Sequence, residues 1–250
     1  MEVRLPAVAG TFYPADPNRL ASQVSGFLSA ASVWEGGHPR ALIVPHAGYI
    51  YSGPIAASAY VTVDPTKVRR VVLVGPSHFV RFRGVALPGA RAFRTPLGDV
   101  PVADADLPVV PSAHAREHSL EVQLPFLQTI LGDFDLIPLA VGDATVTEVA
   151  ASLEPHFEDP GSLIVISSDL SHYLTYEEAY RVDGKTVRSI ERGEGDALGR
   201  EAACGLRGIQ GVLVYAGRHA LEVKLLDLRN SGDTQGDRSR VVGYAAFWIG

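Results

Sequence analysis

The chain has 250 residues, 46% of them apolar and 20% charged, which is the composition of an ordinary globular protein with a hydrophobic core. Its formal net charge of −6 argues against a nucleic-acid-binding protein, because such proteins normally present an extended basic surface. The single cysteine, Cys204, excludes an internal disulfide and a zinc site built from several thiolates. The sequence shows no apolar signal segment and no apolar run of membrane-spanning length, so we expect a cytoplasmic protein without membrane contact.

Strand and helix patterns alternate along most of the sequence. Strands are predicted at 41–45, 70–75, 84–87, 134–140, 162–167, 222–229 and 241–249, and helices at 17–31, 54–61, 119–131, 145–157, 176–192 and 195–204. This alternation is typical of a three-layer α/β/α fold with a central, mostly parallel or mixed sheet. The turn-rich stretch 229–233 predicts that the last two strands pair as an antiparallel hairpin. No repeat or linker divides the chain, so we expect residues 1–250 to form a single domain.

Three of the predicted strands stop at ionisable residues. His46 follows the strand 41–45, His78 follows 70–75, and Asp169 follows 162–167 with His172 shortly after it. The carboxyl ends of parallel strands share one edge of a sheet, where ligands bind, so we expect these side chains to meet in one cleft.

Each of these residues also has a structural interpretation. Taken alone, His46 is better explained as a histidine that hydrogen-bonds a neighbouring loop. Together with His78 it forms a pair of neutral imidazoles, which is a common start to a zinc or iron site. Asp169 and His172 are three residues apart and would share one face of a helical turn, although Asp169 could simply cap a helix.

A further histidine, His118, lies between two acids at the start of a predicted helix. The positions of Glu117 and Glu121 are explained by the favourable interaction of acidic side chains with the positive amino-terminal end of a helix. His118 has no such explanation and could point into the same cleft as His46. The sequence contains no GxGxxG after a strand, no GxxxxGK[ST], no GxSxG and no HExxH, which leaves a histidine-rich metal site as the main candidate.

Six motifs in series give the chain a family resemblance. They are AGTFYP (9–14), PHAGY (45–49), GPSH (75–78), EHSLE (117–121), SDLSH (168–172) and GYAA (243–246). In this order, over nearly the whole length, they resemble the Memo family. The resemblance implies a fold like that of the class III extradiol ring-cleaving dioxygenases, whose mononuclear non-haem iron is held by two histidines and a carboxylate.

The resemblance also implies roles for individual residues. His46 and His78 would be metal ligands, and His172, supported by Asp169, would be an acid/base residue together with His118. Eukaryotic members have a pocket cysteine just before the last strand, but the matching stretch 231–235 has none, and Cys204 lies in a different segment. Asp233 is our expected third ligand, since it would complete a two-histidine, one-carboxylate site; a turn-capping role is the alternative.

These observations favour a metal-dependent, dioxygenase-like oxidoreductase using Fe(II), with zinc or copper as alternative metals. A second hypothesis is a binding or accessory protein that holds a peptide or a partner in the same cleft, where Tyr49, Tyr51, Phe79 and Tyr173 lie beside the histidines. A zinc hydrolase is a third. The ligand is expected to be a small molecule or a peptide, and by family resemblance radical SAM and Ammecr-type proteins are expected companions.

Overall fold

The computed structural model describes residues 2–32 and 34–250, and its centre is a mixed sheet. The strand order is β10–β11–β2–β8–β3–β7–β4, with the short strand β9 paired to β11. The strands are β2 (Ala41–Val44), β3 (Arg70–Pro76), β4 (Val85–Ala86), β7 (Asp135–Val141), β8 (Ser162–Ser167), β9 (His172–Leu174), β10 (Val223–Asn230) and β11 (Val241–Ile249). The central strands β2, β8, β3 and β7 are parallel, and the outer pairs are antiparallel.

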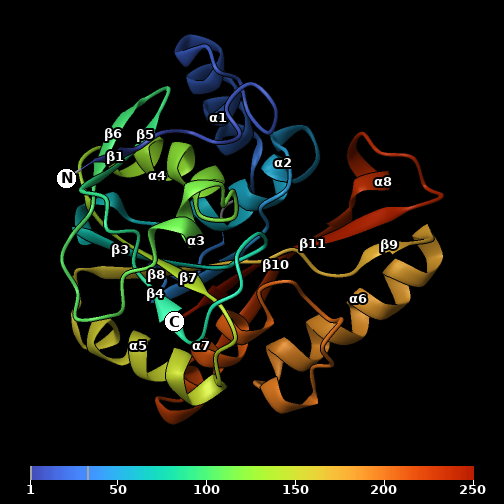
Figure 1. Cartoon of the computed structure of the whole chain (residues 1–250). Helices are drawn as coiled ribbons and strands as arrows, with labels where there is room; N and C mark the ends of the chain where they lie inside the picture. Colours follow the sequence, from blue (N-terminus) through green and yellow to red (C-terminus); the bar gives the residue numbers. More distant parts are fainter. Residues whose placement is uncertain (1, 33) are drawn as a thin grey trace.

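Helices cover both faces of this sheet, as Figure 1 shows. α1, α2 and α4 lie on one face and α5, α6 and α7 on the other, so the predicted three-layer α/β/α fold is confirmed. The helices are α1 (Pro17–Ala30), α2 (Tyr49–Tyr60), α3 (Pro111–Ala115), α4 (Leu124–Leu131), α5 (Val146–Glu158), α6 (Tyr176–Glu191), α7 (Leu206–Arg218) and α8 (Ser231–Thr234), with 3-10 turns η1 (Pro65–Lys67), η2 (Glu121–Gln123) and η3 (Gly195–Ala197). A small second sheet contains β1 (Val3–Arg4), β5 (Ala92–Thr95) and β6 (Gly98–Pro101).

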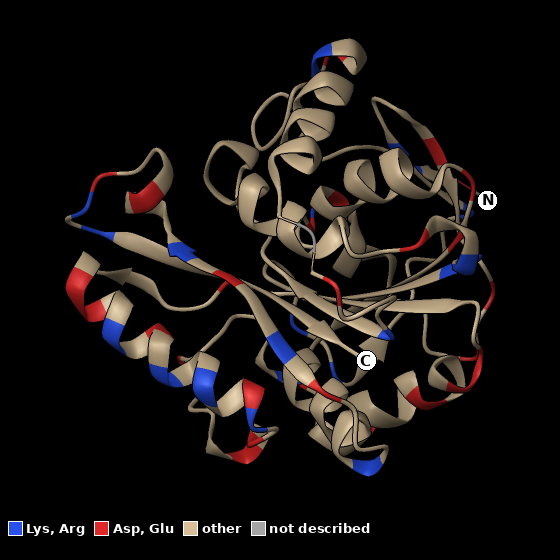
Figure 2. Cartoon of the chain, turned by 180° about the vertical axis from the view of Figure 1, so that it is seen from behind, with Lys and Arg blue, Asp and Glu red and all other residues tan. Residues whose placement is uncertain are grey.

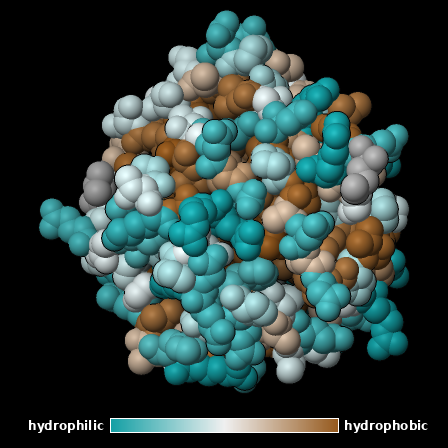
Figure 3. Space-filling model, turned by 90° about the vertical axis from the view of Figure 1, so that its left-hand side faces the viewer, coloured by the Kyte–Doolittle hydropathy of each residue, from teal (hydrophilic) through white to brown (hydrophobic). Residues whose placement is uncertain are grey.

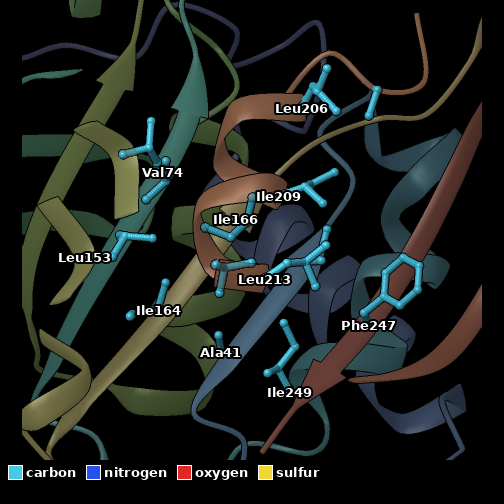
Figure 4. Close-up of a cluster of buried hydrophobic side chains, with 14 of the residues drawn as sticks. Ala41, Val74, Leu153, Ile164, Ile166, Leu206, Ile209, Leu213, Phe247 and Ile249 are labelled. Carbon is cyan, nitrogen blue, oxygen red and sulfur yellow. The ribbon is translucent and has the colours of Figure 1, made fainter. Parts of the chain in front are cut away.

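The central strands β2, β3, β7 and β8 are buried on both faces, which explains their continuous apolar sequences. In β2, Ile43 packs into the core on the α5–α7 side and Leu42 into the core on the α1–α2–α4 side. Figure 4 shows Ile164 and Ile166 of β8 among the side chains that α7 contributes to the first of these cores.

Most predicted elements agree with the structure. Each of the seven predicted strands is present with its ends shifted by at most one residue, and the last two pair antiparallel as predicted. The helix expected at 54–61 begins earlier, at Tyr49, and the helix expected at 119–131 divides into η2 and α4. The small sheet and β9 were not predicted.

The helix predicted at 195–204 is wrong. Only the 3-10 turn η3 forms there, and the helix α7 begins at Leu206 instead. Gly208 and Gly211 make α7 look unfavourable in isolation, but both are packing positions. A Cβ on Gly208 would lie 3.0 Å from Ile166, and one on Gly211 would lie 2.7 Å from Val149. Close packing against β8 and α5 therefore outweighs the low helix propensity of glycine.

The surface is polar and of mixed charge. Figure 2 shows acidic and basic residues interspersed along α6, and Figure 3 shows a largely hydrophilic face with smaller hydrophobic patches. Within the described ranges, none of the helices combines the length and the apolar character that crossing a membrane requires.

Candidate metal centre

Three neighbouring strands deliver the first part of the site to the carboxyl edge of the sheet. β2 pairs in parallel with β8, and β8 pairs in parallel with β3. His46 lies two residues beyond the end of β2, Asp169 two beyond β8, and His78 two beyond β3. The order β2–β8–β3 therefore brings all three residues to one edge, where open α/β sheets bind ligands.

A third histidine completes a cluster at this edge. His118 lies between α3 and η2, and its ring centroid is 5.4 Å from that of His46 and 4.7 Å from that of His78. The rings of His46 and His78 are 5.2 Å apart and nearly perpendicular. One nitrogen from each of the three rings lies within 4.8 Å of the other two. His118, which we expected to be an acid/base residue, is therefore one of the three residues that could hold a metal ion.

Glu117 is buried beneath this cluster and holds His78. Its carboxylate accepts hydrogen bonds from the backbone N–H of His78 (2.7 Å), from Nδ1 of His78 (2.9 Å) and from the backbone N–H of Ser119 (2.9 Å). Burial alone would raise the pKa of Glu117, but these bonds and the nearby His78 outweigh it and lower the pKa to about 2. A carboxylate can only accept, so Nδ1 of His78 carries the hydrogen in this contact, and Nε2 is the ring nitrogen on the opposite side from Glu117.

Burial favours the neutral form of the His46 and His118 imidazoles. His46 is 2% exposed, and its burial, followed by the neighbouring His78 and His118, lowers its pKa well below the usual value. Burial likewise lowers the pKa of His118. Neutral imidazole is the form that binds metals, because only then does a ring nitrogen offer a lone pair.

Asp169 supports the backbone of His46. Its Oδ1 accepts the backbone N–H of His46 at 2.7 Å, and it also accepts from the backbone of Ala47. Burial raises the pKa of Asp169 to about 7, although these two bonds pull it downward. We expected Asp169 to support His172, whereas its direct hydrogen bonds fix the loop that carries His46.

His172 opens the short strand β9. Its Nδ1 lies 2.9 Å from the carbonyl oxygen of Leu170, so Nδ1 donates and Nε2 is left as a proton acceptor. Partial burial lowers its pKa. The next residue, Tyr173, has a φ of 61°, a left-handed conformation that is costly for a non-glycine residue and is found disproportionately at functional sites.

Asp233, the expected third ligand, is engaged elsewhere. It lies in α8, where one carboxylate oxygen accepts the Tyr176 hydroxyl at 2.5 Å and the other accepts the backbone N–H of Asn230 at 2.9 Å. Together with Asn230 it forms a reciprocal capping box. The group of possible ligands among residues 2–32 and 34–250 contains His118 instead. The structure thus matches the capping alternative for Asp233.

Cys204 is the residue whose position the sequence did not reveal. Its Sγ lies 3.2 Å from Nε2 of His46 and accepts the backbone N–H of Asp169 at 3.2 Å. Burial, reinforced by the charge of Asp169, raises the pKa of the thiol to about 12, so the thiol is protonated. The segment before α7 brings this cysteine to the site. The sequence pattern predicts a helix at 195–204 instead of at Leu206–Arg218, so it gives no indication of this contact.

The donor set suits a first-row transition metal. Imidazole nitrogen binds iron, zinc and copper, and a metal-bound histidine usually donates its other N–H to a carboxylate, as His78 does to Glu117. Three nitrogens that bind one ion at about 2.1 Å each cannot all lie more than about 3.6 Å apart. The three nitrogens lie within 4.8 Å of one another, so His46, His78 and His118 could share an ion if the rings moved together by about 1 Å.

Comparisons with known proteins found relatives that match nearly the whole chain. Residues 4–248 match the family described as Memo-like protein. The chain is similar to MEMO1 family proteins from Aeropyrum pernix, at 38% identity over all of both chains, and from Aquifex aeolicus, at 37% identity over 98% of each. It is also 36% identical, over the full length of both chains, to a MEMO1 family protein from Methanosarcina acetivorans.

Proposed function

The chain belongs to the Memo family, and from that premise we propose that His46, His78 and His118 bind one redox-active metal ion, Fe(II), for dioxygenase-like oxidation of a small substrate. The observation that carries the proposal is the convergence of three imidazole nitrogens within 4.8 Å from three separate segments. Imidazole is a ligand that suits iron, and three protein ligands leave positions open for oxygen or substrate.

The side chains around the cluster have separable tasks in this proposal. Fe(II) would supply the one-electron and oxygen chemistry that amino-acid side chains lack. Glu117 fixes the orientation of the His78 ring through a hydrogen bond to Nδ1, and Asp169 fixes the loop that carries His46 through a hydrogen bond to its backbone N–H. His172 offers an Nε2 lone pair, because its Nδ1 is bonded to a carbonyl, and it would accept a proton from the substrate.

Nitric oxide tests the open coordination position that this function needs. Protein loaded anaerobically with Fe(II) should give the electron paramagnetic resonance signal of an iron–nitric oxide adduct, and the His118→Ala variant should lose it. Stoichiometric Fe(II) without an adduct would contradict oxygen chemistry. Tight, exclusive zinc binding would favour the hydrolase, in which metal-bound water is the nucleophile.

The rim of the site favours a second candidate function, the binding of a peptide or protein partner. Phe79 and Tyr173 are 52% and 65% exposed beside site histidines, and the guanidinium groups of Arg116 and Arg240 lie over their rings at 5.1 Å. Tyr49, by contrast, is buried and packs in the core. Exposed aromatic and arginine side chains are enriched at binding hot spots.

Selection from a displayed library of random peptides separates the two functions. If partner binding is the function, metal-free protein should enrich a peptide class that a Phe79→Ser, Tyr173→Ser double variant does not bind. Enrichment that requires the metal, or no enrichment, would contradict it. The family resemblance supports a further proposal, association with radical SAM and Ammecr-type companions, which co-purification with those proteins would test.

A further inference from the structure

A buried chain of hydrogen bonds stands behind His46. It runs from the hydroxyl of Tyr60 in α2 to the side chain of Gln123 in η2, then to Ser167 at the end of β8, and reaches Nδ1 of His46. The first three residues are at most 1% exposed. The hydrogen positions in this chain therefore follow from which groups can donate and which can accept.

The hydroxyl of Ser167 has three polar neighbours and one hydrogen. Its Oγ lies 2.6 Å from the carbonyl oxygen of Ser119, 2.9 Å from Nε2 of Gln123 and 3.0 Å from Nδ1 of His46. Two oxygens at 2.6 Å need a hydrogen between them, and a carbonyl has none to give. The Ser167 hydroxyl therefore donates to Ser119.

The amide of Gln123 is fixed in one orientation. Its Nε2 is 2.8 Å from the carbonyl oxygen of Pro45, and its Oε1 accepts the hydroxyl of Tyr60 at 2.9 Å. The flipped amide would place two carbonyl-type oxygens against each other at Pro45. Gln123 therefore donates to Ser167, and the remaining lone pair of the Ser167 oxygen can only accept a hydrogen from His46.

We propose that Ser167 is a positioning residue that holds the neutral ring of His46 as its Nδ1–H tautomer, so that Nε2 presents a lone pair to the metal. This role rests on the proposed metal site, in which Ser167 is the group that leaves Nε2 of His46 available as the ligand atom. Ser167 ends β8 and pairs with Val44, which ends β2 two residues before His46, so the strand register brings both partners to the same edge of the sheet.

The other side of the ring is consistent with this tautomer. Cys204 lies 3.2 Å from Nε2 of His46, and its sulfur already accepts the backbone N–H of Asp169. The thiol hydrogen can point at Nε2 when that nitrogen is unprotonated, and the carbonyl oxygen of Asp169, 3.6 Å from the sulfur, is its other acceptor. Both ring nitrogens of His46 have partners of the correct type only in the Nδ1–H form.

The tautomer can be read without any metal. In metal-free protein labelled with ¹⁵N-histidine, long-range ¹H–¹⁵N correlation spectra distinguish the protonated ring nitrogen from the unprotonated one. Wild-type protein should show His46 with Nδ1 protonated. In Ser167→Ala, the Nδ1 hydrogen loses its acceptor, and the hydrogen should move to Nε2, where the sulfur of Cys204 can accept it.

Tyr60→Phe is the matched control, because it removes a buried hydroxyl from the same chain but leaves Gln123 anchored by Pro45 and Ser167. It should keep the Nδ1–H tautomer even though it lowers stability. Ser167→Ala should also weaken Fe(II) binding by about 10- to 100-fold, as the loss of a partner behind a metal-bound histidine typically does, whereas Tyr60→Phe should leave the affinity close to that of the wild type.

An Nε2–H tautomer in the wild-type protein would overturn the proposal, and this reading stands even if Ser167→Ala fails to fold. Retention of Nδ1–H in a folded Ser167→Ala, or the same loss of Fe(II) affinity in both variants, would also overturn it. The predicted tautomers in a protein that binds no Fe(II) would support the positioning role and refute the proposed function instead, so the two failures are distinguishable.

Discussion

Glu117 accepts both the backbone N–H and the Nδ1–H of His78, at 2.7 and 2.9 Å, and thereby joins the loop after β3 to the segment that carries His118. The carboxylate is 1% exposed, so this contact is shielded from solvent. One buried acid thus orients one member of the histidine cluster and sits next in sequence to another.

Replacing this acid should weaken metal binding more than it weakens the fold. Glu117→Gln keeps the shape but removes the negative charge, and we expect the affinity for Fe(II) to fall by about 10- to 100-fold in a chelator competition titration. Glu154→Gln removes an exposed carboxylate that pairs with Arg218 and should leave the affinity unchanged. Equal affinities for wild type and Glu117→Gln would refute the supporting role of this residue.

A second buried acid has a structural task. Glu121 is 0% exposed, pairs with Arg4 and accepts the hydroxyl of Tyr13, which fastens the amino-terminal segment to the core. Glu121→Gln leaves Arg4 as an unpaired buried cation and should lower the free energy of unfolding by about 3–5 kcal/mol in urea titrations. This account would be contradicted by a loss no larger than that of the control in the next paragraph.

The control is an exposed ion pair of the same chemistry. Arg94 and Asp99 pair across the β5–β6 turn, and their side chains are 50% and 39% exposed. Because exposed pairs are screened, Asp99→Asn should cost no more than about 1 kcal/mol.

The fall in the free energy of unfolding at acidic pH should depend on His114. Burial lowers its pKa from 6.5 to about 4, and its Nε2 donates to the carbonyl of Ala86 at 2.9 Å. Between these two pKa values the unfolded chain binds a proton that the native protein does not, so stability falls as the pH drops from 6.5 to 4. The loss from this residue is on the order of 3 kcal/mol.

Urea unfolding at pH 7 and at pH 4.5 would measure this loss. His114→Gln retains an N–H for Ala86 without a titrating group, so its stability should fall less on acidification than that of the wild type. His219→Gln, which replaces an exposed histidine, should follow the wild type. An unchanged pH dependence in His114→Gln would contradict the assignment.

The approach of Cys204 to the site depends on the glycine that follows it. A Cβ on Gly205 would lie 2.7 Å from the carbonyl oxygen of Ser167 and 2.7 Å from Cβ of Ser168. Gly205→Ala should therefore cost about 1–3 kcal/mol in thermal or urea unfolding. Gly199→Ala, where a Cβ meets nothing within 4 Å, should be close to neutral. Similar stabilities for both variants would show that the packing at Gly205 is relaxed.

The sequence predicted the part of the site that follows strands. His46, His78 and Asp169 all stand just beyond apolar runs, and parallel strands share their carboxyl edge, so convergence could be inferred without coordinates. Cys204 could not be placed in this way, because its contact with His46 depends on where α7 begins. That helix contains Gly208, which has a low helix propensity but allows close packing against β8. Helix propensities alone therefore do not predict where α7 begins.

The third ligand illustrates the same limit. Asp233 has the right chemistry for a two-histidine, one-carboxylate site, but both of its oxygens are used within and around α8. His118 comes from a segment between short helices, where no strand-end pattern indicates its position. The neighbouring Glu117, which is hydrogen-bonded to His78, and the packing of the His118 ring against Phe12 place this residue at the cluster.

The central claim is that His46, His78 and His118 together hold the metal. The most direct test is the metal content, by plasma mass spectrometry, of wild type, His118→Ala and Asp233→Ala, each purified anaerobically without chelator and reloaded with Fe(II). We predict near-stoichiometric iron in the wild type and in Asp233→Ala, and its loss in His118→Ala. Iron retained by His118→Ala but lost by Asp233→Ala, or a wild type that binds neither iron, zinc nor copper, would contradict the account.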